Sequence, residues 1–205
     1  MKAFSQHKRM VFIWSLIPIA ILVLVFVGPR ADVAGEYLET IEMVGLLMAI
    51  TCLVGRCWST LFIGSRKNNA LVTRGPYAFS RNPLYVFSTI GAFGIGLMME
   101  SLVLGVVAAL LCYAIFSYVI GREEPYLESV FGQDYRDYKA AVPRFFPNPI
   151  TLFSARPSQE PMTFSPQALR RTFMDGLVFL AVFPLIETIG WLQEHEYITP
   201  LLRLW

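Results

Sequence analysis

Residues 83–121 form an apolar stretch that carries one charged side chain, Glu100. A single helix of that length would reach about 60 Å at 1.5 Å per residue. The hydrocarbon core of a bilayer is only about 30 Å thick. The stretch must therefore fold back on itself, and the charge at Glu100 suits an interfacial turn at residues 98–101. We predict a tight hairpin of two membrane helices.

Three further apolar stretches are long enough to cross a bilayer. Residues 10–28 contain no charge, residues 43–64 contain one and residues 173–193 contain two. The whole chain is 55% hydrophobic and 16% charged, against about 25% charged in ordinary soluble domains. This composition argues against disorder and a nucleic-acid-binding arm. We predict an all-α, polytopic membrane protein with about five transmembrane helices, the hairpin supplying spans three and four.

The chain is predicted to form a single membrane domain, residues 1–205, in three parts. The first two spans occupy residues 1–64, the hairpin with its polar flanks occupies 65–149, and a linker with the fifth span occupies 150–205. The first span could also be read as a signal peptide. Its apolar run exceeds the usual 7–15 residues and no small-x-small cleavage site follows, so we expect a retained anchor.

Lys and Arg residues are distributed unevenly about these spans. With the N-terminus in the cytoplasm, only Arg30 and Arg203 lie outside, and Arg56 lies within a span. The other fourteen lie inside: Lys2, Lys8, Arg9, Arg66, Lys67, Arg74, Arg81, Arg122, Arg136, Lys139, Arg144, Arg156, Arg170 and Arg171. Positive residues concentrate in cytoplasmic loops. We therefore predict an integral, multi-pass membrane protein with a cytoplasmic N-terminus and an external C-terminus.

Two polar segments, residues 66–85 and 121–149, bracket the hairpin and should meet at its cytoplasmic mouth. In the first, Tyr77 and Tyr85 supply aromatic faces, which also suit a simple interfacial belt. In the second, Glu123 and Glu124 follow directly on an apolar run. Carboxylates at that depth need a partner, and Arg122 is the nearest candidate in sequence. An amphipathic interfacial segment with a break at Gly132 should follow.

Motifs of soluble enzymes are missing from the sequence. There is no phosphate-binding loop, and both histidines lie far from the polar segments. The three cysteines fall within spans and lack the spacing of metal ligands, so no metal site is expected: Cys52, Cys57 and Cys112. Three glycines in span three indicate close helix packing rather than a dinucleotide site: Gly91, Gly94 and Gly96.

Residues 71–85, LVTRGPYAFSRNPLY, and residues 122–147 together resemble the isoprenylcysteine carboxyl methyltransferase family, and phospholipid methyltransferases share part of the pattern. The shared elements are LVTxGPYxxxRxPxY, a two-span hairpin, a Glu pair and FGxxYxxYxxxVPRxxP. The combination is specific, whereas each piece alone is weak. The resemblance implies a membrane methyltransferase that uses S-adenosyl-L-methionine and acts on a lipid-phase acceptor, with its cofactor-binding catalytic region in residues 65–149.

The resemblance also assigns residues. It implies a cofactor site built from both polar segments: Ala70, Leu71, Val72, Tyr77, Asn82, Pro83, Tyr85, Glu123 and Glu124. Asn82, Arg122 and Glu124 become the candidate catalytic residues. Asn82 stands where many members have His, and Ile120 stands where members acting on prenylated proteins have an Arg that contacts the acceptor carboxylate. Carboxylates would complement the cationic cofactor, and aromatic faces suit its adenine or sulfonium.

Arg56, within span two, is the candidate for contact with the acceptor's head group, together with Arg122. A cation at that depth needs an anion, and Asp175 and Glu187 of the fifth span are the alternatives to the acceptor itself. The acceptor could present an amine, a thiol or a carboxylate. The alternative function is a non-catalytic transporter or sensor subunit that retains the methyltransferase scaffold, in which these charges form an intramembrane pathway.

Overall fold

A computed structural model describes residues 27–28, 35–64, 70–147, 164–199 and 202–203. The first predicted span, residues 10–28, lies outside the described residues except for its last two. Those two form strand β1, Val27–Gly28, which pairs in parallel with β2, Leu202–Arg203. All other regular elements of the described chain are helices, as the apolar stretches predict.

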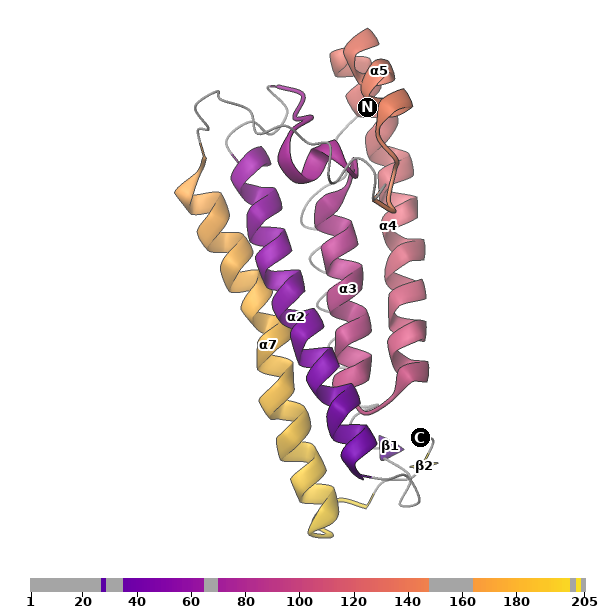
Figure 1. Cartoon of the computed structure of the whole chain (residues 1–205), viewed down its shortest axis with the longest axis vertical. Coiled ribbons are helices and arrows are strands. Elements are labelled where there is room, and N and C mark those ends of the chain that lie inside the picture. Colours follow the sequence, from indigo (N-terminus) through magenta and orange to yellow (C-terminus); the bar gives the residue numbers. More distant parts are fainter. Residues whose placement is uncertain (1–26, 29–34, 65–69, 148–163, 200–201, 204–205) are drawn as a thin grey trace.

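Four helices run side by side: α2 (Gly35–Ile63), α3 (Pro83–Met98), α4 (Leu102–Phe131) and α7 (Pro166–Glu194). Helix α2 lies at the centre of the arrangement, since it packs against both α3 and α7, while α4 packs against α3 (Figure 1). A short 3-10 helix, η1 (Gly75–Ala78), precedes α3, and α5 (Gln133–Ala141) follows α4.

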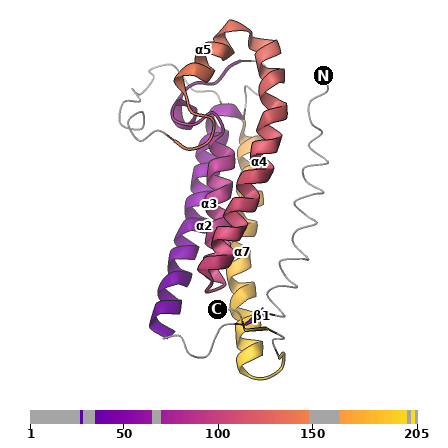
Figure 2. The same ribbon diagram turned by 90° about the vertical axis from the view of Figure 1, so that its right-hand side faces the viewer.

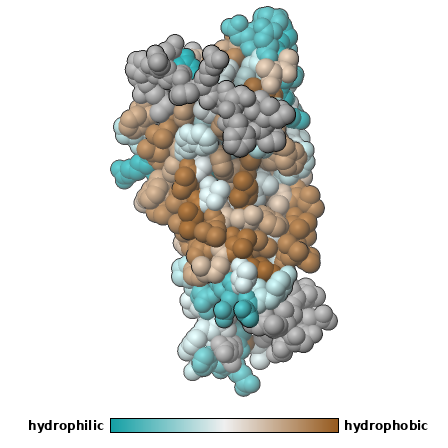
Figure 3. All heavy atoms as spheres, viewed as in Figure 1, coloured by the Kyte–Doolittle hydropathy of each residue, from teal (hydrophilic) through white to brown (hydrophobic). Residues whose placement is uncertain are grey.

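Three of these helices, α2, α4 and α7, are long and apolar enough to cross a membrane, and α3 is a shorter apolar helix of 16 residues. A broad hydrophobic band crosses the middle of the surface, with hydrophilic residues gathered at both ends (Figure 3). Each long helix extends beyond the predicted span because polar residues at its ends continue the helix. Helix α2, for example, begins at Gly35 rather than at residue 43.

The hairpin between α3 and α4 turns at residues 99–101, inside the predicted range. Glu100 adopts a positive φ of 57°, and the Ser101 side chain caps α4 by accepting a hydrogen bond from the Leu104 amide at 3.2 Å. A Cβ atom on Gly96 would lie 2.1 Å from the Gly105 nitrogen. Only glycine at position 96 lets the two helices approach this closely. Gly91 and Gly94 face α2 at similarly short range, which confirms the packing role predicted for these glycines.

Helix α4 does not end near Glu123 and Glu124, as the sequence pattern suggested, but continues to Phe131 despite Pro125 in its interior. Its 30 residues reach about 45 Å, so the last turns rise beyond the hydrocarbon core. Gly132, with a φ of 57°, then redirects the chain into α5, which turns back beside the end of α4 (Figure 2). The predicted break at Gly132 is confirmed.

Candidate functional site

The two predicted polar segments meet at one end of the bundle, which we call the site end. There η1 and the loop into α3 lie beneath α5 and the chain that follows it (Figure 1). Five hydrogen bonds between described residues more than 50 positions apart join them. The Ser80 hydroxyl donates to the Phe145 carbonyl at 2.8 Å, and the Asn82 amide nitrogen donates to the Arg144 carbonyl at 2.9 Å. The convergence expected from the hairpin is therefore present.

The same junction is closed by two further bonds. The Tyr138 hydroxyl donates to the Tyr77 carbonyl at 2.7 Å, and the Arg81 backbone nitrogen donates to the Pro143 carbonyl at 3.0 Å. Tyr77 and Tyr138 are both buried. Because each bond satisfies a backbone carbonyl, together they fix the path of residues 143–145 against the start of α3.

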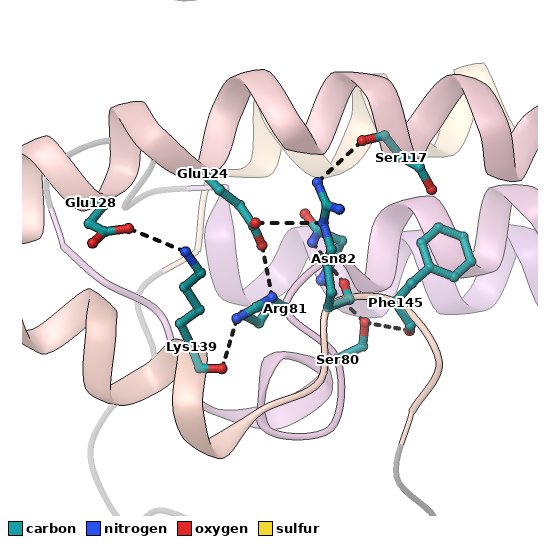
Figure 4. A network of polar contacts seen from close by, with 9 residues as sticks. Ser80, Arg81, Asn82, Ser117, Glu124, Glu128, Lys139 and Phe145 are labelled. Carbon is teal, nitrogen blue, oxygen red and sulfur yellow. Dashed lines mark hydrogen bonds and ion pairs between the residues drawn. The ribbon is translucent and has the colours of Figure 1, made fainter.

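Glu124 is the centre of the network (Figure 4). Its side chain is 11% exposed, and its two oxygens lie 3.0 Å from Nη2 of Arg81 and 3.5 Å from Nε of Arg144. Arg81 is 8% exposed and also donates from Nη1 to the Lys139 carbonyl at 2.9 Å. One carboxylate thus holds two guanidinium groups that come from the two polar segments. Such a pair is costly to break from one side because the remaining charge is buried.

Glu123 belongs to a second, more open arrangement. The Tyr85 hydroxyl donates to its Oε2 at 3.1 Å, and the Tyr85 ring stacks on Phe116 with centroids 4.5 Å apart. Beside them, Tyr113 contacts the rings of Phe145 and Phe146 at 4.9 and 5.5 Å. An aromatic wall therefore connects the membrane part of α4 with the polar network.

The buried tyrosines of the site are donors rather than bases. Burial raises the pKa of Tyr135 to about 12, with the Glu124 carboxylate as the next cause. Burial also raises the pKa values of Tyr77 and Tyr138, with neighbouring tyrosines adding to the effect. All three hydroxyls therefore keep their protons at neutral pH.

Arg122 does not join this network. Its side chain is exposed, lies over the Tyr118 ring at 5.4 Å and donates to the Tyr118 hydroxyl at 3.3 Å. The expectation that Arg122 pairs with Glu124 is wrong, because Arg81 and Arg144 are the partners of Glu124. The reason is helical geometry, since residues two apart in a helix point to nearly opposite sides.

The remaining predicted cofactor residues lie at the site end with differing exposure. Pro83 begins α3 and is buried, and Tyr77 lies in η1 with 5% exposure. Leu71 and Val72 are half-buried on the chain leading to η1, and Ala70 before them is exposed. The structure thus collects the predicted cofactor residues at one end, whereas the two predicted acceptor-binding residues differ: Arg122 faces away from the network and Arg56 lies deeper in the bundle.

Arg56 lies within α2 and is half-buried. Its Nη1 donates to the Ser88 hydroxyl of α3, while Nε is enclosed without a partner among the described residues. Neither of the two acidic residues of α7 that were expected as its partners, Asp175 and Glu187, reaches it. Glu187 shares a hydrogen bond with Glu42, fourteen residues before Arg56 on α2, and Asp175 is exposed.

Five enclosed side-chain atoms lack a hydrogen-bond partner within the described residues: Glu42 Oε1, Arg56 Nε, Tyr77 Oη, Arg81 Nε and Glu124 Oε1. Three belong to the polar network, and a fourth, Arg56, lies a short way below it. The contact between Arg81 and Glu124 is thus an ion pair without aligned hydrogen bonds. Buried polar atoms in native proteins are nearly always bonded, so a cluster of unbonded ones indicates a place for a ligand or water.

Sequence reasoning missed Arg81 and Arg144 as the partners of Glu124. Both are fixed letters of the quoted pattern, the Arg of RxPxY and the Arg of VPRxxP. Their spacing along the chain gave no reason to pair them with Glu124. The motif letters themselves were the available signal.

The fold and site define a helical membrane protein that gathers an arginine–carboxylate network at the mouth of a helical hairpin. Residues 38–134 match the family described as Phospholipid methyltransferase. The Schizosaccharomyces pombe protein-S-isoprenylcysteine O-methyltransferase is 34% identical over 55% of this chain and 45% of its own length. The chain belongs to the isoprenylcysteine carboxyl methyltransferase and phospholipid methyltransferase family.

Two bacterial relatives match more of the chain. The cobalt-zinc-cadmium resistance protein CzcN of Cupriavidus metallidurans is 36% identical over 74% of this chain and 66% of its own length. The nickel-cobalt-cadmium resistance protein NccN of Alcaligenes xylosoxydans xylosoxydans is 30% identical over 95% of this chain and 88% of its own length. No solved structure gives a significant match.

Proposed function

We propose that this chain is an S-adenosyl-L-methionine-dependent membrane methyltransferase whose acceptor is a lipid or another apolar molecule. The observation that carries the proposal is the set of enclosed polar atoms on Tyr77, Arg81 and Glu124 that make no hydrogen bond within the described residues, in a chain of this family. These atoms lie where the two polar segments meet. They supply both donors and an acceptor to a polar ligand.

The residues present fit the chemistry of this cofactor. It is cationic at its sulfur and amino group and anionic at its carboxylate. Glu123 and Glu124 offer carboxylates to the cationic groups, and Arg144, whose side chain is 43% exposed, offers a guanidinium to the carboxylate. The Tyr85–Phe116 stack supplies aromatic faces. Ala70, Leu71 and Val72 complete the site as proposed backbone and apolar contacts.

When bound, the cofactor supplies an electrophilic methyl group. The task of the chain's own residues is then to align the two substrates and to exclude water. Arg81, Arg144 and Glu124 hold the two polar segments in register, and Asn82 fixes the chain at Arg144 through its amide. Asn82 cannot act as a base, and the buried tyrosines keep their protons. The site therefore favours an acceptor whose nucleophilic atom needs no strong base.

The two substrates approach from different phases in this proposal. The cofactor enters from the cytoplasm at the site end, as the distribution of Lys and Arg suggests. The acceptor arrives from the bilayer, alongside the membrane part of the aromatic wall formed by Tyr113, Phe116 and Tyr85. An amine, a thiol and a carboxylate remain the candidate nucleophiles, and the described contacts do not give Arg122 a part in binding them.

A second candidate function is a non-catalytic part in metal resistance, favoured by the names of the two bacterial relatives. Within the described residues, no group of three or more His, Cys, Asp or Glu could hold a metal ion. Among the described residues the intramembrane charge pathway that this function suggested is also not assembled, because Glu187 of α7 meets α2 at Glu42, fourteen residues before Arg56. We therefore place the methyltransferase first.

The test is methyl incorporation by the purified full-length chain in vesicles of total bacterial lipid. We expect label from methyl-labelled S-adenosyl-L-methionine to enter the organic phase. The double variant Tyr77→Phe, Glu124→Gln should abolish this incorporation. Glu128→Gln, on the exposed end of α4, is the matched control and should keep the activity. If the wild-type protein fails to bind the labelled cofactor in every lipid and detergent tested, the non-catalytic function is favoured instead.

A further inference from the structure

We propose that Arg56 binds the anionic group of the methyl acceptor, which makes the acceptor an anionic amphiphile with a carboxylate or a phosphate. The inference rests on the proposed function, because it names the class of molecule that the same site takes from the bilayer. It starts from one charge in the membrane part of the bundle that the polar network leaves unused.

Arg56 is a cation at membrane depth. It lies seven residues before the end of α2 at Ile63, which places it about 10 Å inside that end of the helix. Its one bond to a described residue goes to the neutral hydroxyl of Ser88, and Nε is enclosed without a partner. An ionised group at this depth is costly unless it meets an opposite charge, and such residues mark binding sites by default.

Three described acidic residues could be expected to pair with Arg56, and each is engaged elsewhere or exposed. Glu124 already has two arginine partners, and Glu187 is bonded to Glu42, about 21 Å along α2 from Arg56. Asp175 is exposed and makes no ion pair with a described residue. Two acidic residues, Asp32 and Glu160, lie outside the described residues, so the experiment includes their variants. Within the described chain, the charge of Arg56 is left for a ligand.

The position of Arg56 suits an amphiphile that reaches the methyl-transfer site. Ser88, its partner on α3, is six residues after Asn82, so Arg56 lies about 9 Å deeper than the polar network. One turn further along α2, the Thr60 hydroxyl meets Thr172 of α7 at 2.9 Å. Hydroxyl groups therefore continue from Arg56 toward the site end between three apolar helices. A polar head group can lie along them while its hydrocarbon stays in the bilayer.

Thermal unfolding of the full-length chain in phosphatidylcholine nanodiscs tests the proposal. The probes are decanoate, decyl phosphate and, as the uncharged control, decanol. We expect at least one anionic probe to raise the unfolding temperature by about 5 °C at saturation and decanol to leave it unchanged. A response to decanoate alone indicates a carboxylate, and a response to decyl phosphate alone indicates a phosphate; either supports the proposal.

The variant Arg56→Met should abolish this shift, whereas Arg170→Ala, an exposed arginine on α7, should retain it. Without probe, Arg56→Met should unfold at or above the wild-type temperature, because it removes an uncompensated buried charge. A lower unfolding temperature or failure to fold would show an internal anionic partner and overturn the proposal. So would probe shifts equal in Arg56→Met and wild type, or shifts that appear only after Asp32→Asn or Glu160→Gln.

Binding of labelled S-adenosyl-L-methionine is measured on the same samples. We expect Arg56→Met to bind it within twofold of wild type, since Arg56 lies below the polar network. A wild type that binds no cofactor but shows the Arg56-dependent shift would contradict the proposed function while supporting the anion site. A wild type that binds the cofactor but responds to no anionic probe would contradict the anion site alone.

Discussion

Glu124 and Arg56 are two charges enclosed in the same molecule, and they are compensated in opposite ways. Glu124 has guanidinium groups at 3.0 and 3.5 Å, drawn from two distant segments. Arg56 has one neutral hydroxyl and an enclosed nitrogen without a partner in the described chain. Glu124 therefore stabilises the site through ion pairs within the chain, whereas Arg56 is the charge that we propose binds a ligand. Removing the first should cost stability, and removing the second should cost binding.

The largest expected effect is on Glu124. Glu124→Gln leaves Arg81 and Arg144 facing a neutral amide, and we expect the free energy of unfolding to fall by about 3 kcal/mol. The measurement is thermal or denaturant unfolding of the purified chain in a fixed detergent. Glu128→Gln is the control, because Glu128 is 32% exposed and paired with exposed Lys139 and Arg136. Its loss should stay within about 0.5 kcal/mol. Similar losses of unfolding free energy for the two variants would contradict the central role of Glu124 in the network.

The two arginines around Glu124 should differ. Arg81 is 8% exposed and makes a second bond to the Lys139 carbonyl, whereas Arg144 is 43% exposed. We expect Arg81→Met to cost about 2–3 kcal/mol and Arg144→Met about 1 kcal/mol, because solvent screens the more exposed pair. Unfolding measured in low and high salt checks this, and only the Arg144 contribution should shrink with salt. A larger loss of stability for Arg144→Met than for Arg81→Met would contradict the assignment of Arg81 and Glu124 as the buried ion pair.

A neutral bond in the same junction should contribute less. Tyr138→Phe removes the donor to the Tyr77 carbonyl and leaves that buried oxygen unpaired, so we expect a loss of about 1–2 kcal/mol. Tyr118→Phe provides the matched control, since the Tyr118 hydroxyl bonds only the exposed Arg122 in the described chain. The control should change stability by less than about 0.5 kcal/mol. Equal effects would mean that the junction is open to water.

The smallest expected effect on stability is at the end of the bundle opposite the site. Its sign is also opposite, because replacing Glu100 should stabilise the protein rather than destabilise it. Burial, and then the neighbouring Glu187, raise the pKa of Glu100. A raised pKa in the folded state means that stability is fully present below the unfolded-state pKa and is lost as the pH rises through the folded value. We therefore expect Glu100→Gln to lose less stability than wild type as the pH rises above about 4, the ordinary pKa of a glutamate. Parallel pH profiles for the two proteins would contradict this assignment.

The hairpin and the meeting of the polar segments could be predicted from the sequence, because bilayer thickness limits how long an uncharged helix can run. The turn at Glu100 followed from its charge alone. The continuation of α4 to Phe131 was not predicted, since the rule that detects spans counts apolar residues and stops where they stop. The helix also accommodates Pro125 in its interior.

The partners of Glu124 were beyond prediction for a different reason. Arg81 is 43 residues before it and Arg144 is 20 after it, so only the folded chain reveals the contact. Proximity in sequence suggested Arg122, which helical geometry turns away. The face of the helix carried a usable signal, because Ile120 and Glu124, four residues apart, share the buried side of α4. From the sequence, Arg81 and Arg144 can be identified only because they are fixed residues of the family pattern.

The central claim is that the site end binds the cationic methyl donor through the segments that Glu124 joins. Calorimetric titration of the purified full-length chain with S-adenosyl-L-methionine tests it most directly. We predict one binding event per chain, weakened at least tenfold by Glu124→Gln and less than twofold by Glu128→Gln. No heat of binding to the folded wild type, or equal affinities for the two variants, would contradict it.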